Sequence, residues 1–216
     1  MKKRVAILIS GRGSNMMALV EAARAPDYPA EVALVISNRP DAPGLQRAQS
    51  AGIKALAIDH KAHATREAFD AAVEAALAGE GIDLVCHAGF MRIQSEAFAA
   101  RWLGRQINIH PSLLPSFKGL HPHKQALDAG VRISGCTVHF VTPELDSGPI
   151  IAQAAVPVLA GDTPETLAER ILVAEHRLYP FALRLVASGE ARLEDGRVVL
   201  LKGWVSRGDS LFSPTA

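Results

Sequence analysis

An amide and an imidazole stand two residues apart in a short motif of this sequence. Asn108 and His110 open the run Asn-Ile-His-Pro-Ser-Leu-Leu-Pro. Side chains at positions i and i+2 of a strand share one face, so both groups could address the same atom. Such a pair suits acyl transfer, because one group polarises a carbonyl while the other handles a proton. The alternative is that His110 is an ordinary buried or loop histidine.

A turn rich in aspartate, glycine and proline follows later, as Glu-Leu-Asp-Ser-Gly-Pro over 144–149. An isolated Asp-x-Gly often marks nothing more than a turn. If this turn folds back toward the strand that carries His110, Asp146 could orient the imidazole and favour its charged form. The pattern therefore offers a third candidate for the same chemistry.

A glycine-containing turn near the N-terminus is a candidate phosphate site, formed by Gly11, Arg12, Gly13, Ser14 and Asn15. It lies between a predicted strand and a predicted helix, where backbone N–H groups face an anion. The third glycine of the dinucleotide fingerprint is replaced by Met16, and the chain has no Walker loop. A single bound phosphate is the favoured interpretation, and a purely structural turn is the alternative.

A second edge segment reads Gly-Phe-Met-Arg-Ile over 89–93, directly after a predicted strand. Ligands of open α/β sheets bind at the carboxyl ends of the strands, so this segment could line an apolar pocket; core packing is the alternative.

Arg66, early in a predicted helix, could reach a ligand carboxylate or simply be exposed. His121 and His123 are too few to form a zinc site, since a catalytic zinc needs three protein ligands. The sequence therefore predicts no metal.

These motifs are positioned by an alternating pattern of strands and helices. After residue 130 two strands, 136–141 and 150–158, follow each other without a helix between them, and a long amphipathic helix then runs from about 163 to Gly189. The pattern predicts an α/β fold, a doubly wound and mostly parallel sheet with helices on both faces, mixed toward the C-terminal half. The earlier predicted strands are 5–10, 32–37, 55–58, 82–88 and 107–109, and the earlier predicted helices are 16–24, 44–51, 65–78 and about 96–102.

Composition excludes several classes of protein. The chain has 216 residues, of which 49% are hydrophobic and 21% charged, so a disordered chain is excluded. A net charge of +1 argues against nucleic-acid binding by bulk charge, and no apolar run reaches the about 18 residues of a membrane span. Cys86 and Cys136 form no disulfide framework, which fits a cytoplasmic protein. We expect small-molecule partners and a monomer or homodimer.

Taken together and in this order, the motifs resemble the phosphoribosylglycinamide formyltransferase family. The resemblance covers residues 4 to about 200, and it rests on the glycine turn, the segment 88–93, the Asn-x-His-Pro-Ser-Leu-Leu-Pro run, Gly-Leu-His over 119–121 and Leu-Asp-Ser-Gly-Pro over 145–149. It implies transfer of the formyl group of 10-formyltetrahydrofolate to the amine of glycinamide ribonucleotide in de novo purine biosynthesis. It also implies a single formyltransferase domain over 1–205, with a phosphate-binding half at about 1–100 and a folate and catalytic half at about 101–205, before a flexible tail at 206–216.

The resemblance also assigns roles to residues by position. Gln94 stands where the family has an apolar residue, and Lys118 where it has a proline. The implied catalytic residues are Asn108, His110 and Asp146; Gly11, Arg12, Gly13, Ser14 and Asn15 would hold the ribonucleotide phosphate, Glu175 would contact the ribonucleotide, and Arg66, Met91, Arg92, Ile93, Gln94 and Asn108 would contact the folate.

Three other functions compete with this interpretation. A formyltetrahydrofolate deformylase uses the same trio with water as acceptor, but we expect an extra N-terminal domain, for which residues before the first strand leave no room. A methionyl-tRNA formyltransferase would add a C-terminal domain. A non-catalytic module that binds a phosphate ligand would keep residues 11–15 and would not need Asn108, His110 and Asp146 together.

Overall fold

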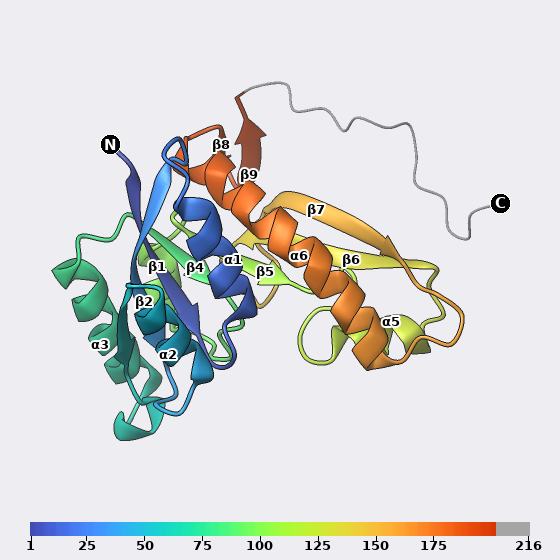
Figure 1. The fold of residues 1–216 in the computed structure, drawn as a ribbon, viewed down its shortest axis with the longest axis horizontal. Helices are drawn as coiled ribbons and strands as arrows, with labels where there is room; N and C mark the ends of the chain where they lie inside the picture. The colour runs from blue at the N-terminus through green and yellow to red at the C-terminus, as the bar shows by residue number, and fades with distance from the viewer. Residues whose placement is uncertain (202–216) are drawn as a thin grey trace.

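The computed structural model describes residues 1–201, and these form one α/β unit (Figure 1). The predicted tail at 206–216 lies outside the described residues. The strands are β1 (Lys3–Ile9), β2 (Ala30–Ser37), β3 (Lys54–Ala57), β4 (Leu84–His87), β5 (Gln106–His110), β6 (Ile133–Phe140), β7 (Ile150–Pro157), β8 (Ala191–Glu194) and β9 (Arg197–Leu200). The helices are α1 (Ser14–Ala23), α2 (Pro43–Ser50), the 3₁₀ turn η1 (His60–Ala62), α3 (Arg66–Gly79), α4 (Glu96–Arg101), α5 (Pro122–Asp128) and α6 (Pro164–Ala187).

Seven strands form one sheet in the order β3-β2-β1-β4-β5-β6-β7. Strands β1 to β5 run parallel to one another, whereas β6 is antiparallel to both β5 and β7. The predicted mixed, doubly wound sheet is therefore confirmed. The strand order reverses between β1 and β4, which is where sheets of this kind leave a crevice for ligands.

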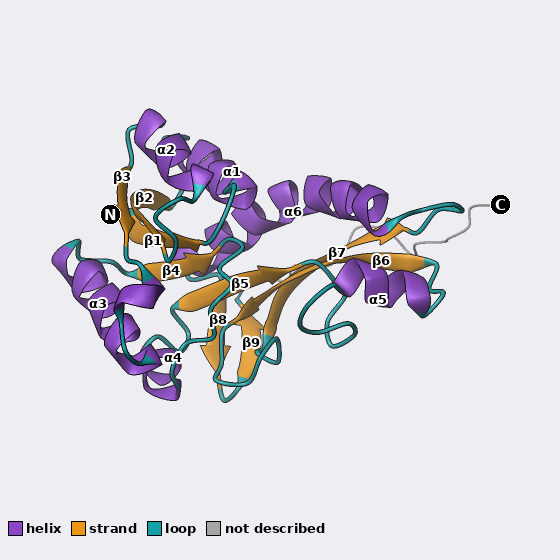
Figure 2. Cartoon of the chain, turned by 90° about the horizontal axis from the view of Figure 1, so that it is seen from below, coloured by secondary structure: helices purple, strands orange, loops and turns teal. Residues whose placement is uncertain are grey.

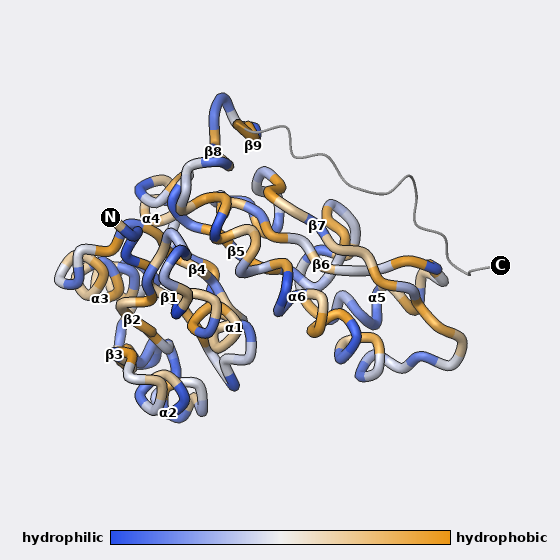
Figure 3. The backbone as a smooth tube through the Cα atoms, turned by 45° about the horizontal axis from the view of Figure 1, so that its top comes forward, coloured by the Kyte–Doolittle hydropathy of each residue, from blue (hydrophilic) through white to orange (hydrophobic). Residues whose placement is uncertain are grey.

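Helices cover both faces of the sheet. Figure 2 shows α1, α2 and α6 on one side and α3 and α4 on the other. The two hydrophobic clusters correspond to these faces: Ile7 and Ile9 pack with Leu19 of α1, while Ala6 and Leu8 pack with helix α3 and α4 side chains. Successive residues of β1 therefore point into opposite cores, which is why this strand is a continuous apolar run. Figure 3 shows apolar and hydrophilic residues alternating along α6.

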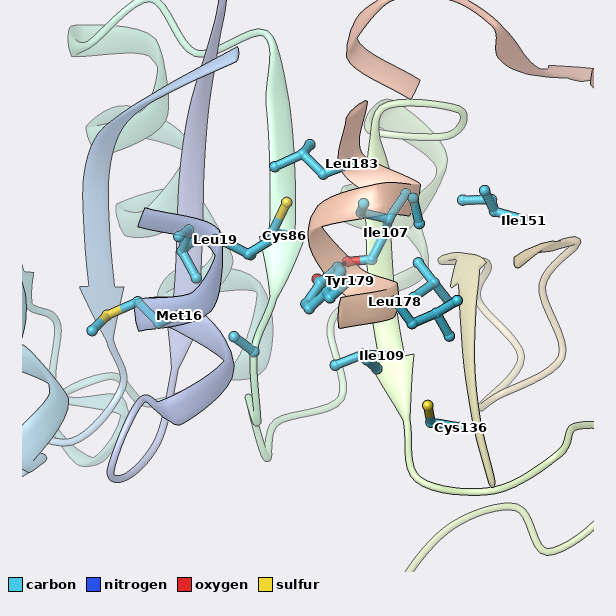
Figure 4. Close-up of a cluster of buried hydrophobic side chains, with 14 of the residues drawn as sticks. Met16, Leu19, Cys86, Ile107, Ile109, Cys136, Ile151, Leu178, Tyr179 and Leu183 are labelled. Carbon is cyan, nitrogen blue, oxygen red and sulfur yellow. Dashed lines mark hydrogen bonds between the residues drawn. The ribbon is translucent and has the colours of Figure 1, made fainter. Parts of the chain in front are cut away.

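Helix α6 packs on the sheet and forms hydrogen bonds with the neighbouring strands β4 and β5. Thr163 caps its N-terminus in a reciprocal pair with Thr166. Fully buried Tyr179 donates hydrogen bonds to the carbonyl oxygens of His87 on β4 and Ile107 on β5, at 2.8 Å and 3.2 Å. Figure 4 shows Tyr179 beside Ile107 among the core side chains. The helix thus fixes two strands whose carboxyl ends carry candidate site residues.

Two helical segments were not predicted from the sequence. The 3₁₀ turn η1 follows β3, and α5 follows the proline-rich loop after β5. Helix α5 is only seven residues long, and its first residue is Pro122, preceded by His121 in the left-handed region at φ 57°. A helix of two turns shows too little periodicity to be predicted by pattern. Asp195 and Gly196 form the turn of the antiparallel hairpin between β8 and β9.

Within residues 1–201, no helix combines the length and apolar character that crossing a membrane would require.

Candidate active site

The candidate residues from three separate motifs gather at one edge of the sheet. Strands β1, β4 and β5 are parallel, so the turn at 11–15, the segment after His87 and the end of β5 lie at their carboxyl ends. His87 and Asn108 are register partners on β4 and β5. The antiparallel strand β6 then adds His139 directly opposite Asn108. The topology of the sheet therefore places an amide between two imidazoles.

The turn after β6 folds back onto β5 and brings a carboxylate to His110. Asp146 Oδ2 lies 3.4 Å from His110 Nδ1, and the two side chains are only 8% and 7% exposed. Gly148 permits this return, because a Cβ at its position would lie 1.7 Å from the carbonyl oxygen of Phe140. Asp146 itself adopts φ 48°, a left-handed conformation that aspartate tolerates better than most residues.

The proline-rich loop holds this turn in place from the other side. The N–H of Gly119 donates to Asp146 Oδ2 at 2.9 Å, and Lys118 Nζ donates to Ser147 Oγ at 2.5 Å. Lys118 therefore joins the two loops.

Both ring nitrogens of His110 face hydrogen-bond acceptors. Nε2 lies 2.9 Å from the carbonyl oxygen of Phe117, while Nδ1 faces Asp146. A carbonyl oxygen can only accept, so Nε2 carries a proton. A proton on Nδ1 would face the carboxylate of Asp146 at 3.4 Å. The geometry therefore suits a histidine that holds and transfers a proton next to an anion.

Asn108 is oriented by His139, a residue that the sequence analysis did not single out. Asn108 Nδ2 lies 3.2 Å from His139 Nε2, and His139 Nδ1 lies 2.9 Å from the carbonyl oxygen of Phe140. Because Nδ1–H must donate to that carbonyl, Nε2 accepts from the amide when the ring is neutral. Burial lowers the pKa of His139, which favours this neutral state. One N–H of Asn108 is then bound and the other is left for a ligand.

A pocket opens beside these residues, bounded on one side by the segment after β4 and on the other by the turn after β6. Arg92 packs its guanidinium 5.2 Å from the ring centre of Phe69, which fixes one wall. The pocket is lined by residues that lie in or after β4, β5 and β6: His87, Phe90, Arg92, Ile93, Gln94, Ala99, Asn108, His139, Val141, Thr142, Pro143, Glu144, Leu145 and Asp146.

The structure brings some of the expected folate contacts to this pocket and leaves others outside it. Arg92, Ile93, Gln94 and Asn108 line it. Met91 is 68% exposed and Arg66 is exposed at the start of α3, and neither belongs to the lining formed by the described residues. Gln94 has a buried side-chain oxygen that no group within residues 1–201 satisfies. Gln94 therefore lies in the pocket wall with a side-chain oxygen that has no hydrogen-bond donor from residues 1–201.

The turn at 11–15 has the geometry of an anion site. Gly13 is the N-cap of α1 in the left-handed conformation, with φ 69°, and no side chain caps the helix. The first N–H groups of α1 are thus left without a side-chain acceptor, and the positive end of the helix dipole adds to their attraction for an anion. Gly13 is required because a Cβ there would approach Met16 to 3.0 Å in a strained backbone conformation. Arg12 is exposed beside it.

Asn15 and Glu175 form a buried pair that links α1 to α6. Asn15 Nδ2 donates to Glu175 Oε2 at 2.7 Å, and the residues are 9% and 5% exposed. Burial raises the pKa of Glu175 to about 7, although the hydrogen bond from Asn15 opposes the shift. The carboxyl group is therefore close to half protonated near neutral pH, and the side-chain oxygen of Asn15 has no partner within residues 1–201.

This pair makes stability depend on pH. The pKa of Glu175 is about 7 in the folded chain against 4.5 in a model compound, so stability is fully present below about pH 4.5 and falls as the pH rises through about 7. The difference amounts to about 3 kcal/mol. Glu175→Gln keeps the acceptor for Asn15 and cannot ionise. We expect its melting temperature to exceed that of the wild type increasingly from pH 5 to pH 8, and parallel melting curves at all pH values would contradict the assignment.

The two histidines at the start of α5 do not gather further ligands. His121 precedes the helix and His123 lies within it. Within the described part of the chain, no three histidine, cysteine, aspartate or glutamate side chains are grouped so that they could hold a metal ion.

Comparison with known proteins places this chain among formyltransferases. The formyl transferase family matches residues 3–183. The trifunctional purine biosynthetic protein adenosine-3 of Bos taurus is 54% identical over 198 residues, which cover 91% of this chain and 20% of that protein. The chain thus spans about a fifth of the length of these trifunctional relatives. The phosphoribosylglycinamide formyltransferase of Escherichia coli is 44% identical over 88% of this chain and 90% of its own length.

Solved structures agree. Glycinamide ribonucleotide transformylase 1 of Symbiobacterium toebii superposes with a TM-score of 0.90 at 51% identity, covering 93% of this chain and 95% of that chain. The phosphoribosylglycinamide formyltransferase of Brucella melitensis has a TM-score of 0.84 at 55% identity, with 88% and 97% of the two chains covered.

Proposed function

The chain belongs to the formyl transferase family, and on that premise we propose that it transfers a formyl group from 10-formyltetrahydrofolate to the amine of glycinamide ribonucleotide. The observation that carries this proposal is the contact of His110 with Asp146, next to a partly apolar pocket that Asn108 and Asp146 line. The names of its relatives suggest that the reaction serves purine biosynthesis.

The reaction needs a hydrogen-bond donor for the formyl oxygen and a group that carries a proton. The neutral amine attacks the formyl carbon, forming a C–N bond, and negative charge develops on the formyl oxygen. The free N–H of Asn108 is suited to donate to that oxygen. A protonated His110 can add a second donor once its Nε2–H turns away from the carbonyl oxygen of Phe117. The C–N10 bond then breaks, N10 takes a proton, and the attacking nitrogen loses one. His110, directly or through water, is suited to carry that proton, and Asp146 stabilises its charged form.

The two substrates fit different parts of the site. In this proposal the folate ring occupies the pocket between the segment 90–94 and the turn 141–146. The phosphate of the ribonucleotide binds the uncapped N-terminus of α1, and the buried pair of Asn15 and Glu175 faces the rest of that substrate. His110 and Asn108 at the end of β5 lie on the strand next to β4, which separates them from β1 and the phosphate turn. This order supports a position for the amine and the formyl group between the two proposed binding regions.

The test is an absorbance assay of folate deformylation with purified protein and 10-formyltetrahydrofolate. We expect the signal only when glycinamide ribonucleotide is added, together with formylated ribonucleotide in equal amount. An equal rate without the ribonucleotide would show that water is the acceptor, as in a deformylase. Binding of either ligand by folded protein without turnover would indicate a non-catalytic module, and both outcomes would overturn the proposal.

A further inference from the structure

The wall of the pocket contains a histidine for which the proposed reaction has no use. His87 is the last residue of β4, is 6% exposed, and lines the pocket beside Asn108. The edge of its ring packs against Phe90, with ring centres 5.4 Å apart and planes at 75°. The imidazole lies on the face of the sheet where Ala6, Leu8 and Val85 point into the hydrophobic core.

A second buried polar residue fixes the ring. His87 Nε2 lies 3.0 Å from the side-chain oxygen of Gln106, which is completely buried at the start of β5. That oxygen can only accept, so the proton of the neutral ring is on Nε2 and Nδ1 presents a lone pair. Burial lowers the pKa of His87 to about 4, with Gln106 opposing the shift, so the ring is neutral at physiological pH. The protein therefore builds an oriented, uncharged acceptor.

This acceptor is open to the pocket. Within residues 1–201 Nδ1 has no hydrogen-bond partner, and it does not belong to the polar atoms that are both unpartnered and sealed from solvent. Because His87 lines the pocket and its Nδ1 is not sealed from solvent, Nδ1 is the ring nitrogen available to a ligand there. A nearly buried acceptor without a protein partner costs free energy unless water or a ligand supplies a donor.

We propose that Nδ1 of His87 accepts a hydrogen bond from an N–H group of the bicyclic ring of the bound folate, which makes His87 a specificity-determining residue. This inference rests on the proposed function. The reduced ring carries several N–H donors, on its amino group and on its ring nitrogens, so a neutral acceptor in the wall complements it. A polar site of this kind discriminates strongly, because a ring without the donor leaves the acceptor unpaired.

The first test is made on the wild-type protein, with its histidines labelled with ¹⁵N. Without ligand, His87 should show a protonated Nε2 and an unprotonated Nδ1. Addition of 10-formyltetrahydrofolate, without the ribonucleotide, should move the Nδ1 resonance toward lower frequency, as expected for a nitrogen that accepts a hydrogen bond. An unmoved Nδ1 resonance at saturation, or a proton found on Nδ1, would overturn the inference.

The second test replaces both members of the buried pair by leucine. Removing His87 alone would leave Gln106 unpaired, whereas the variant His87→Leu, Gln106→Leu replaces both polar groups by apolar ones and should stay folded. We expect its Kd for 10-formyltetrahydrofolate to rise about 10- to 100-fold, with kcat at saturation within about threefold of the wild type. An unchanged Kd, or a loss confined to kcat, would contradict a binding role.

The two proposals fail in different ways. If the wild type binds the folate but does not formylate the ribonucleotide, the proposed reaction is wrong while the His87 contact is still decided by the resonance and the Kd. If the wild type does not bind the folate at all, both are overturned.

Discussion

Replacing Asp146 with asparagine is expected to lower kcat about 10²- to 10⁴-fold, with a smaller change in the Kd of either substrate. Asparagine has the same shape and can still accept the hydrogen bond from the N–H of Gly119. It removes the negative charge, which lies 3.4 Å from His110 Nδ1 and 3.8 Å from His139 Nε2. The loss should therefore appear in the step that needs a charged imidazole, because binding does not require it.

The measurement is steady-state kinetics over a range of pH, combined with direct binding of each substrate. Asp128→Asn is a matched control and should stay within about twofold of the wild type. Within residues 1–201 this exposed aspartate forms an ion pair with Lys124 alone, one turn earlier on α5. A loss in Asp146→Asn that lies entirely in binding would refute the role given to this carboxylate.

The second large effect concerns Asn108. Asn108→Ala removes an N–H donor aimed at the developing oxyanion, and a group of this kind typically contributes about 10²- to 10³-fold to kcat. His139 holds the amide with its Nδ2 at 3.2 Å, so the donor needs no reorganisation during the reaction. The effect should again be larger on kcat than on folate binding, although Asn108 lines the pocket.

A variant of equal size separates the donor from the shape of the side chain. Asn108→Asp fills the same space but offers an acceptor in place of the N–H group, and it should be at least as slow as Asn108→Ala. Single-turnover rates at saturating folate report the chemical step without product release. If Asn108→Asp turns over at the rate of the wild type, the amide acts by packing and the oxyanion role is wrong.

Much of the fold follows from local patterns. The apolar run of β1, the alternation of strands and helices up to β5, and the start of α6 at Thr163 all rest on neighbouring residues. The short helix α5 was missed, because two turns opened by Pro122 carry no readable period. The antiparallel strands β6 and β7 were anticipated, since no helix separates them.

Some features of the candidate site also follow from the sequence alone. The sequence by itself determined the types of group and, through the two-residue spacing of a strand, that Asn108 and His110 share a face. It also determined that residues 11–15 lie at a strand–helix junction, where N–H groups are free. These facts concern contacts close in the chain, which residue types and periodicity constrain directly.

Only the tertiary structure decided the distant contacts. The turn that carries Asp146 reaches His110 because Gly148 lets the backbone pass Phe140, and Glu175 meets Asn15 because α6 crosses the sheet to α1. The strand register identified His87 and His139 as site residues, because it places one on each side of Asn108. Packing of the whole chain sets the strand register, the burial of each side chain and the path of a returning loop. A single sequence motif therefore cannot specify which carboxylate contacts which histidine, or which imidazole is buried.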